Sequence, residues 1–416
     1  MHLNYMFQHF LKPIKRWRKS YLPGIVTASA DDDPSSISTY SVIGATTGFS
    51  QLWLFFVSTP LLIAIHQITA RIGDVTKKGL ITLIKENYGR RVAFLSVLVL
   101  VAANLLSLVA DIVGMAAGFQ LLTNWSYLYF IVPLIILVWY IIVFDSYKKI
   151  AQYFGWFAGI ILAYFLAGIL AKPDWGLIFK SIIMPPIKFN AAYFMAALGL
   201  IGTSFSPYAF FWQTEEEIEE NHGVKQIGSS SRAVILGFIY SGLAAFFVVV
   251  ASASVVLKTD INFLTVKDIA QALTPVAGQW ATKLFGIGLI GSGILAIPIL
   301  AISSAYGVAE FFKWPQGLDQ KPGKAKGFYR LITFGFIFSL AALLFDLNPI
   351  KVLFYSQVMV GAITPIMIYF ILRLASNPKV MGDLCCTRWT VIGGWLALLL
   401  LILGDIFLFF YLFNLG

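Results

Sequence analysis

Charged residues are scarce in this sequence. Asp, Glu, Lys and Arg make up 12% of its 416 residues, whereas soluble domains contain about 25%. Hydrophobic residues make up 59%, and no part of the chain has the composition of a separate soluble domain. The composition therefore predicts a polytopic membrane protein. We do not expect nucleic-acid binding from the net charge of +10, because the basic residues follow the loops between apolar stretches.

Cysteine and histidine are scarce as well. The two cysteines, Cys385 and Cys386, are adjacent and fall in a predicted inner loop. Neighbouring cysteines in a reducing compartment rarely form a structural disulfide, so we expect two free thiols. The sequence also lacks a His/Cys metal cluster, a Ser-His-Asp set and a phosphate-binding loop, which argues against a membrane-bound enzyme or sensor. We expect no catalysis and no resident cofactor.

A cleaved signal peptide is not expected. Residues 1–22 mix basic and aromatic side chains without a separate apolar core, and they are predicted to form a cytoplasmic arm that touches anionic headgroups. The rest of the chain contains about eleven apolar stretches of roughly 18–25 residues or more, enough to cross a bilayer. They occupy approximately residues 23–48, 51–70, 92–120, 127–145, 152–171, 190–213, 232–257, 276–310, 328–345, 350–373 and 389–413.

The basic residues are distributed unevenly between the two sides of this predicted bundle. With the N-terminus placed inside, the inner loops contain about 23 of the 30 Lys and Arg residues and the outer loops about 6, as the positive-inside rule requires. We therefore expect a cytoplasmic N-terminus, an external C-terminus and contact with membrane lipids. The expected location is a bacterial plasma (inner) membrane, and the expected state is a monomer.

The first apolar stretch is interrupted by acidic residues. Within residues 24–41, the consecutive carboxylates Asp31, Asp32 and Asp33 precede Pro34. A carboxylate at the middle of a bilayer costs about 2.5–3.5 kcal/mol, so we expect these three to face a water-filled or protein-lined cavity. Proline lacks an N–H and clashes with the preceding turn, so the helix breaks here and the freed carbonyls can bind a cation.

The sixth stretch repeats this pattern, with GTSFSPY at residues 202–208. Pro34 and Pro207 each lie in the first span of a group of five, and because five is odd the second group must be inverted. Paired discontinuous helices in inverted halves indicate the central site of a transporter. We predict an all-α fold with a 5+5 inverted repeat. Its parts are an arm (1–22), a first repeat (23–171, spans 1–5), an inverted second repeat (190–374, spans 6–10) and an additional eleventh span (387–416).

Three other polar features leave alternatives open. Asp111 in the third span is expected to face the bundle interior, either bound to a structural partner or on an ion path. Gln357 in the tenth span either supplies an amide oxygen to an ion or caps a helix contact. The acidic run TEEEIEENHG at residues 214–223 is either a solvated helix end or an inner vestibule that concentrates cations.

The residue types at the two interruptions favour a hard cation. Neither motif contains Cys, Met or His, and oxygen ligation suits Mg²⁺, Ca²⁺ or Mn²⁺. Because Mg²⁺ keeps several waters, we predict a partly hydrated divalent ion. Its candidate ligands are the side chains of Asp33, Ser36, Thr203, Ser206 and Gln357 and the carbonyls of Ala30 and Thr203. Asp31 and Asp32 are expected near the ion without binding it, because three adjacent helical side chains span too wide an arc.

These motifs, together with the run HQITARIGDVTKKGL after the second span, resemble the Nramp family of divalent metal transporters. That family pairs Asp-Pro-Gly-Asn in its first span with Met-Pro-His in its sixth, on a LeuT-like inverted repeat. The forms DDDPSS and GTSFSPYAFFWQTEEEIEE are more similar still to the Nramp-related magnesium transporters. The resemblance covers essentially the whole chain, and it implies a LeuT-like fold with discontinuous first and sixth helices.

The resemblance also implies a ligand set. Asp33 takes the place of the family's ligand Asp, and Ser36 that of its Asn. Ser206 replaces the Met that lets Nramp proteins reject Mg²⁺ and Ca²⁺. Ala30 and Thr203 correspond to carbonyl donors. Gln357 corresponds to the polar residue of the tenth span.

Departures from the family pattern bear on proton coupling. Tyr208 replaces a titratable His that is linked to proton movement. Asp111 matches a family acidic residue, but Gly114 stands where a second would be, and the ninth span lacks mid-membrane arginines. The resemblance therefore favours facilitated Mg²⁺ uptake, with Mn²⁺ as a second substrate and without proton coupling. Two alternatives stay open: a proton-coupled Mn²⁺/Fe²⁺ transporter, and a sodium-coupled symporter of an organic solute on the same fold.

Overall fold

The computed structural model describes residues 24–144 apart from 26, residues 162–256, 281–342 and 348–413, and the single positions 267 and 278. Every regular element in these ranges is helical. The predicted arm over 1–22 and parts of the fifth span lie outside the described residues, as does most of the connection between the seventh and eighth spans.

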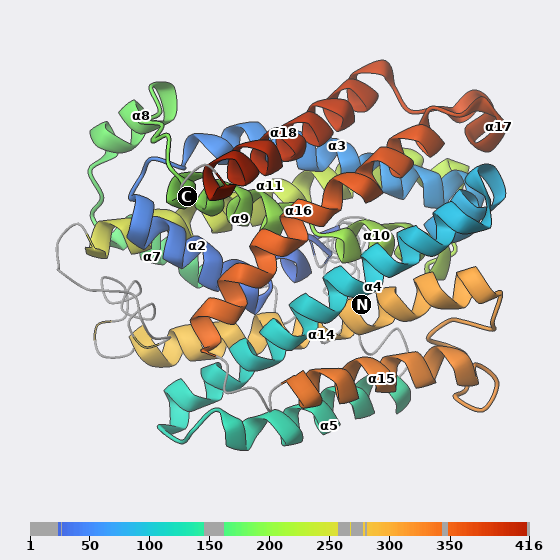
Figure 1. The fold of residues 1–416 in the computed structure, drawn as a ribbon, viewed down its shortest axis with the longest axis horizontal. Coiled ribbons are helices and arrows are strands. Elements are labelled where there is room, and N and C mark those ends of the chain that lie inside the picture. The colour runs from blue at the N-terminus through green and yellow to red at the C-terminus, as the bar shows by residue number, and fades with distance from the viewer. Residues whose placement is uncertain are drawn as a thin grey trace, which may run out of the picture.

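Figure 1 shows the helices of the bundle and their order. The described residues between 24 and 31 are helical, and α2 follows them after the interruption. The labelled helices of the first half are α2 (Pro34–Thr47), α3 (Trp53–Thr76), α4 (Leu80–Thr123), α5 (Leu128–Phe144), α7 (Leu162–Leu170) and α8 (Trp175–Ile183). Those of the second half are α9 (Ala191–Ser204), α10 (Pro207–Glu219), η2 (Val224–Gln226), α11 (Ile227–Val256), α14 (Ala281–Phe312), α15 (Lys326–Ala342) and α16 (Pro349–Ala375). The last elements are α17 (Pro378–Met381), η5 (Gly382–Leu384) and α18 (Arg388–Phe413).

The helices agree with the spans expected from apolar length. Seven helices among the described residues are long and apolar enough to cross a membrane, and α5 is a shorter apolar helix. Both predicted interruptions are present: the first span breaks before α2, and the sixth is divided into α9 and α10. The connection before the third span is also helical, and Gly89 at φ 85° bends it away from the rest of α4. The all-helical membrane fold is thereby confirmed.

The interior of the bundle is assembled around the two broken helices. α11 packs on α2 and α3, α16 packs on α4 and α9, and the long helices α4 and α14 run along each other (Figure 1). Gly24 and Gly237 allow the first half-helix to approach α11 closely. A Cβ at position 24 would lie 2.4 Å from the carbonyl carbon of Ala233, and one at position 237 would lie 2.1 Å from the carbonyl oxygen of Gly24. Small residues at such crossings are typical of membrane helix pairs.

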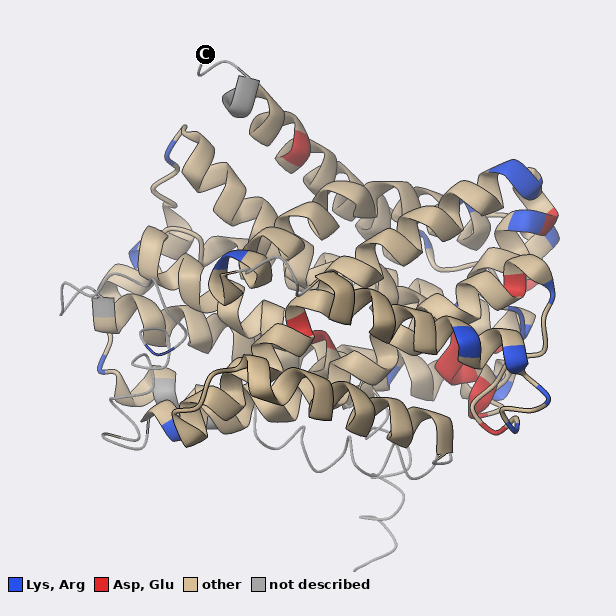
Figure 2. Cartoon of the chain, turned by 60° about the horizontal axis from the view of Figure 1, so that its bottom comes forward, with Lys and Arg blue, Asp and Glu red and all other residues tan. Residues whose placement is uncertain are grey.

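The outer surface is apolar over much of its area. Large hydrophobic side chains such as Phe94, Ile136, Phe338 and Phe409 are more than two-fifths exposed, which in a soluble protein would mark an interaction surface. Charged residues instead gather mainly at one end of the bundle, where Lys and Arg surround a group of acidic residues (Figure 2). This division into an apolar belt and a charged end is expected of a protein that spans a bilayer.

Candidate functional site

Asp33 lies at the first interruption and caps the helix that follows it. Its backbone is extended (φ −70°, ψ 171°), and its carboxylate accepts a hydrogen bond from the Ser36 amide at 2.6 Å. Pro34 follows at the first helical position, where its missing N–H costs nothing. The chain therefore leaves one helix at Asp32 and begins α2 with a carboxylate cap, which is among the strongest N-caps. Asp33 itself is completely buried.

The second interruption lies between α9 and α10. Phe205 (φ −105°, ψ 57°) and Ser206 (φ −78°, ψ 123°) are not helical, and Pro207 begins α10. The Ser206 hydroxyl donates to the carbonyl of Thr203 at 3.1 Å, inside the end of α9. Carbonyls at the end of a half-helix lack their usual amide partners, so this hydroxyl satisfies one of them.

The two interruptions meet in the interior of the bundle. The Tyr208 hydroxyl, at the start of α10, lies 3.0 Å from the Ala30 carbonyl oxygen and 3.2 Å from Oδ2 of Asp33. The Asp31 carboxyl interacts with the Ser206 side chain. Residues 33 and 206 are therefore on facing segments rather than on opposite flanks of the bundle.

Asp111, in the third span (α4), also lies at this site. Its Oδ1 accepts a hydrogen bond from the Ser35 amide at 3.0 Å and another from the Ser35 hydroxyl. Its side chain also contacts that of Asp33, and both carboxyls are fully buried. Two buried carboxyl groups in contact need a shared proton or a cation between them. Asp111 thus has a structural partner in Ser35 and also lies directly beside the predicted ion ligand.

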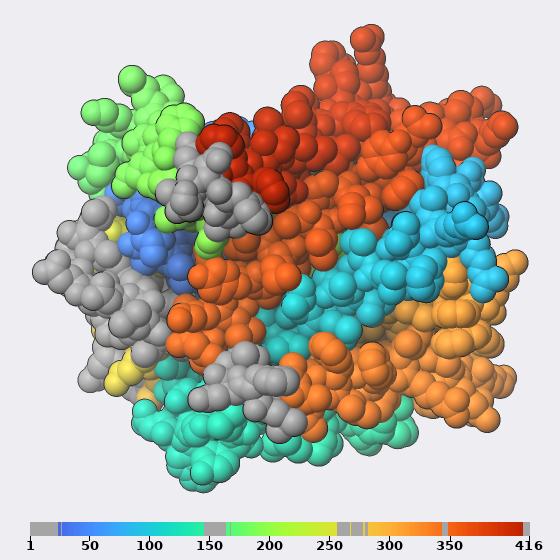
Figure 3. All heavy atoms as spheres, in the orientation of Figure 1, coloured from blue at the N-terminus to red at the C-terminus, as the bar shows by residue number. Residues whose placement is uncertain are grey.

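Gln357 contributes from α16. A Cβ on Gly202 would lie 2.1 Å from the Gln357 carbonyl oxygen, so α9 and α16 touch backbone to backbone here. The Thr364 hydroxyl also donates to the Phe205 carbonyl at 3.0 Å, which fixes α16 against the second interruption. The Gln357 side chain is fully buried, and neither its amide oxygen nor its amide nitrogen has a hydrogen-bond partner. Figure 3 shows α16 crossing the surface diagonally beside α4.

The remaining predicted site residues lie at the interruptions, already linked to each other. The Ser36 hydroxyl donates to the Asp31 carbonyl at 3.1 Å, so its oxygen keeps free lone pairs. The Ala30 carbonyl is within hydrogen-bond distance of Tyr208, and that of Thr203 accepts from Ser206. Asp32 points elsewhere, since its side chain interacts with Ser241 of α11. Asp31 and Asp32 each retain a buried oxygen without a hydrogen bond.

The acidic run after the sixth span is not a solvated helix end. Glu215, Glu216 and Glu217 are 2%, 5% and 4% exposed, because α3, α4 and α14 pack against α10. Glu216 accepts a hydrogen bond from the Thr27 hydroxyl at 2.7 Å, and Glu215 contacts Glu310 of α14. The solvated interpretation is therefore wrong for these three residues, and their carboxylates belong to the interior of the bundle end.

Sequence reasoning missed several polar residues that the fold brings into these clusters. Ser35 holds Asp111, Glu310 caps the start of α4 through the Thr82 amide at 2.8 Å, and Asp74 faces Glu217. A carboxylate near the end of an otherwise apolar helix was the available signal for Asp74 and Glu310. No local signal distinguished Ser35 from the other hydroxyls of its segment.

Comparison with known proteins places these motifs in a family. Residues 24–411 match the family described as Natural resistance-associated macrophage protein-like, or Nramp. The divalent metal cation transporter MntH of Klebsiella pneumoniae (strain 342) is 24% identical over 399 residues, which cover 91% of each chain.

Solved structures support the same fold. The manganese transporter of Eremococcus coleocola matches with a TM-score of 0.72 at 18% identity, over 93% of this chain and 85% of that one. Mhp1, a nucleobase-cation-symport-1 family transporter in a closed conformation, matches with a TM-score of 0.59 at 13% identity, over 94% and 90% of the two chains. The predicted LeuT-like architecture is confirmed by these matches.

Proposed function

The chain belongs to the Nramp family, and from that premise we propose that it is a secondary transporter of divalent metal ions, with Mg²⁺ as its main substrate and Mn²⁺ as a second. Its relatives are transporters rather than enzymes. The ion would bind between the two interrupted helices and reach either side of the membrane in turn. We keep the division into a first repeat, an inverted second repeat and an eleventh span as part of this proposal.

One observation supports this function above the others. Where the two interruptions meet, one carboxylate oxygen of Asp31 and both polar atoms of the Gln357 amide are buried without hydrogen bonds. Buried polar groups are normally satisfied, because each unsatisfied one costs about 1–3 kcal/mol. A hydrated cation would satisfy such oxygens directly and through its waters. Asp33 would supply the anionic ligand, and Ser36 and Ser206 would contribute neutral oxygens.

The ligand chemistry favours Mg²⁺ over softer metals. The described interruptions present carboxylate, hydroxyl, amide and carbonyl oxygens, and no sulfur atom or imidazole lies within residues 30–36 or 202–208. Oxygen donors suit Mg²⁺, Ca²⁺ and Mn²⁺, whereas thioether and imidazole groups favour later transition metals. The small side chains of Ser36 and Ser206 are suited to an ion that keeps several of its waters.

The membrane potential would drive inward transport without protons. A divalent ion gains about 4.6 kcal/mol for each 100 mV, twice the value for a single charge. This gain alone supports accumulation of more than about a thousandfold. We accordingly propose a uniporter of the plasma membrane, with its N-terminus in the cytoplasm and its C-terminus outside, acting as a monomer among membrane lipids.

Proteoliposomes test this function. Vesicles containing the purified full-length chain are given an inward Mg²⁺ gradient and an inside-negative potential, while a lumenal dye reports Mg²⁺ and a second dye reports pH. We expect Mg²⁺ influx that Mn²⁺ inhibits by competition and that leaves the lumenal pH unchanged. Absence of influx with Mg²⁺ and with Mn²⁺ would refute divalent transport.

A proton-coupled Mn²⁺/Fe²⁺ transporter is the second candidate. The contact between the buried carboxyls of Asp33 and Asp111 favours it, because a proton shared by that pair would be displaced when an ion binds Asp33. The same vesicles separate the two mechanisms. Lumenal acidification that accompanies metal influx would establish coupling, and the Asp111→Asn variant would then lose the acidification.

The sodium-coupled symporter of an organic solute is tested in parallel. The clustered aspartates at the first interruption suit a divalent ion better than a zwitterion. We expect no amino-acid uptake when a sodium gradient is applied to these vesicles. Sodium-dependent uptake of an amino acid would revive that alternative.

A further inference from the structure

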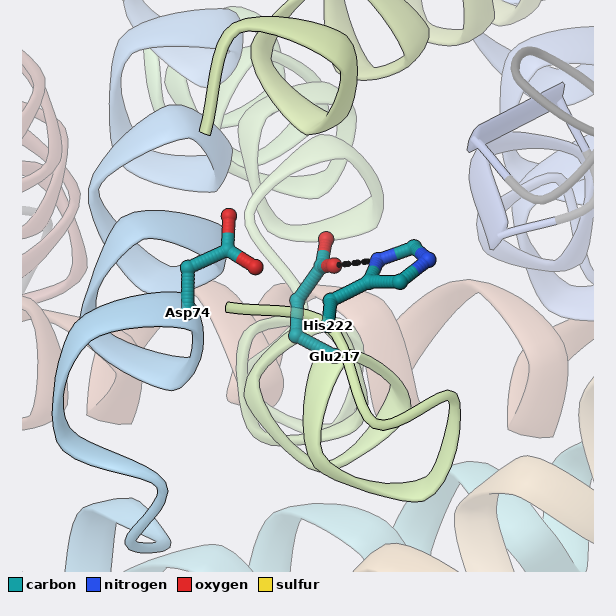
Figure 4. Close-up of side chains that lie close together, drawn as sticks. All are labelled: Asp74, Glu217 and His222. Atoms are coloured by element: carbon teal, nitrogen blue, oxygen red, sulfur yellow. Dashed lines mark hydrogen bonds and ion pairs between the residues drawn. The ribbon is translucent and has the colours of Figure 1, made fainter. Parts of the chain in front are cut away.

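A second polar cluster lies at the charged end of the bundle, away from the interruptions. It consists of Asp74 in the last turn of α3, Glu217 near the end of α10 and His222 in the turn that follows (Figure 4). One ligand atom from each of the three lies within 4.8 Å of the others. We call these three residues the end cluster.

The approach of α3 to α10 creates this cluster. A Cβ on Gly73 would lie 2.7 Å from the Thr214 carbonyl oxygen and 3.1 Å from Cβ of Glu217. Only a glycine at position 73 permits this contact without displacement of a helix. The adjacent Asp74 is thereby placed opposite Glu217, and Figure 4 shows its carboxylate directed toward that of Glu217.

Asp74 is the unsatisfied member of the cluster. Its residue surface is only 1% exposed, and neither carboxylate oxygen accepts a hydrogen bond of standard geometry. The Ser230 hydroxyl lies beside it but donates to Glu217 at 3.1 Å. Because burying a carboxylate without a partner is costly, a cation bound beside Asp74 would stabilise its charged form.

Glu217 and His222 are already oriented toward the same point. Glu217 accepts hydrogen bonds from the Gln213 amide at 3.1 Å and from Ser230, and its Oε2 lies 2.5 Å from Nδ1 of His222. Nε2 of His222 lies 3.1 Å from Glu220. The imidazole is 28% exposed, so the cluster is open on this side, whereas Glu217 is 5% exposed.

The local charge balance is negative. The elements that meet here carry the carboxylates of Asp74, Glu216, Glu217 and Glu220, and the facing cationic groups are Lys77 and His222. Hydrogen bonds to Glu217 and Glu220 raise the pKa of His222 to about 10. Both ring nitrogens of His222 therefore face carboxylates, in a part of the molecule where carboxylates outnumber cationic groups.

The geometry points to a second divalent-cation site, in which Asp74, Glu217 and His222 bind one metal ion at the charged end of the bundle. Two carboxylates and one imidazole form a donor set suited to Mn²⁺, Fe²⁺ or Zn²⁺, and less suited to Mg²⁺, which prefers oxygen ligands alone. The ion would take the place of the hydrogen between Nδ1 of His222 and Oε2 of Glu217, and that proton would leave to solvent. This site is independent of transport through the interruptions, and it differs from them in its preference for nitrogen-binding metals.

A spectroscopic experiment tests the site in the full-length protein in detergent, with Mn²⁺ alone as the probe. Electron spin echo modulation from ¹⁴N reports a histidine bound to Mn²⁺, and equilibrium dialysis reports the number of ions bound. We expect the wild type to show ¹⁴N modulation that is lost in His222→Gln. We expect Asp74→Asn to bind one ion fewer, with at least a tenfold loss of affinity at that site.

Two control variants make the result specific. Asp33→Asn changes the proposed transport site and is expected to keep the ¹⁴N modulation, so failure of the transport proposal and failure of this one remain distinguishable. Glu86→Gln removes an exposed carboxylate that pairs with Lys78 and is expected to leave Mn²⁺ binding unchanged. Wild-type protein without ¹⁴N modulation would overturn the site even if a cluster variant fails to fold. Unaltered modulation in the well-folded His222→Gln variant would overturn it equally.

Discussion

Replacing Asp33 by Asn separates ion binding from folding. The Asp33 carboxylate caps α2 through the Ser36 amide at 2.6 Å, and asparagine caps a helix about as well as aspartate does. We therefore expect the free energy of unfolding of Asp33→Asn to lie within about 0.5 kcal/mol of the wild-type value. Asp33→Ala removes the cap as well as the charge, and we expect it to lower the free energy of unfolding by about 0.5–2 kcal/mol.

Ion transport is expected to respond far more strongly to the same change. Mutation of a group that only orients a metal ligand typically lowers metal affinity by about 10–100-fold. Asp33 is proposed as the one carboxylate that binds the ion directly, so its loss is expected to cost at least about 100-fold, or about 2.7 kcal/mol. The asparagine keeps the shape of the side chain, so the effect measures the missing charge.

The assay is Mg²⁺ uptake into proteoliposomes under an inside-negative potential, at Mg²⁺ concentrations below saturation. Thermal unfolding of the same preparations shows whether each variant is folded. We expect Asp33→Asn to melt like the wild type and to transport at less than about one hundredth of its rate. Wild-type uptake by a folded Asp33→Asn protein would refute the assignment of this carboxylate as the ion ligand.

Three further changes probe selectivity, packing and a thiol. Ser206→Met adds a soft thioether, which is expected to shift preference from Mg²⁺ toward Mn²⁺ or Cd²⁺ in competition uptake; an unchanged profile would count against Ser206 as a ligand. Gly202→Ala forces a methyl group to 2.1 Å from the Gln357 carbonyl oxygen, and we expect it to destabilise the protein by about 1–3 kcal/mol in melting experiments. Gly228→Ala is the neutral control, because a Cβ at that position has no atom within 4 Å. Burial raises the pKa of the Cys386 thiol to about 11. In a variant without the neighbouring cysteine, maleimide labelling of Cys386 is therefore expected to be slow at pH 7. The labelling rate is expected to rise about tenfold per pH unit at pH values below about 11. Fast labelling at pH 7 that does not depend on pH would contradict a raised pKa of this thiol.

Local chemistry explains why the helices and their interruptions could be predicted. Apolar length alone identified the spans that became α3, α9 to α11, α14, α16 and α18. Pro34 and Pro207 remove a backbone donor at fixed places, and each one begins the second half of a broken helix. Asp33 precedes its proline directly, so its position at the interruption followed from sequence.

Contacts between distant residues could not be predicted in the same way. Asp111 bonds to Ser35 across 76 residues, Tyr208 reaches Asp33 across 175, and Thr27 reaches Glu216 across 189. Each depends on how helices pack in three dimensions, which apolar periodicity does not encode. The acidic run was ambiguous for this reason, because its burial arises from α3, α4 and α14.

The central claim is that one hydrated divalent ion binds where the two interrupted helices meet. Anomalous diffraction from crystals of the full-length protein soaked in Mn²⁺ locates such an ion directly. We expect a peak bounded by the Asp33 carboxylate, the Ser206 hydroxyl and the Gln357 amide, and its loss in crystals of Asp33→Asn. Ordered density for these side chains without a peak between them, in protein that still transports Mn²⁺, would contradict the account.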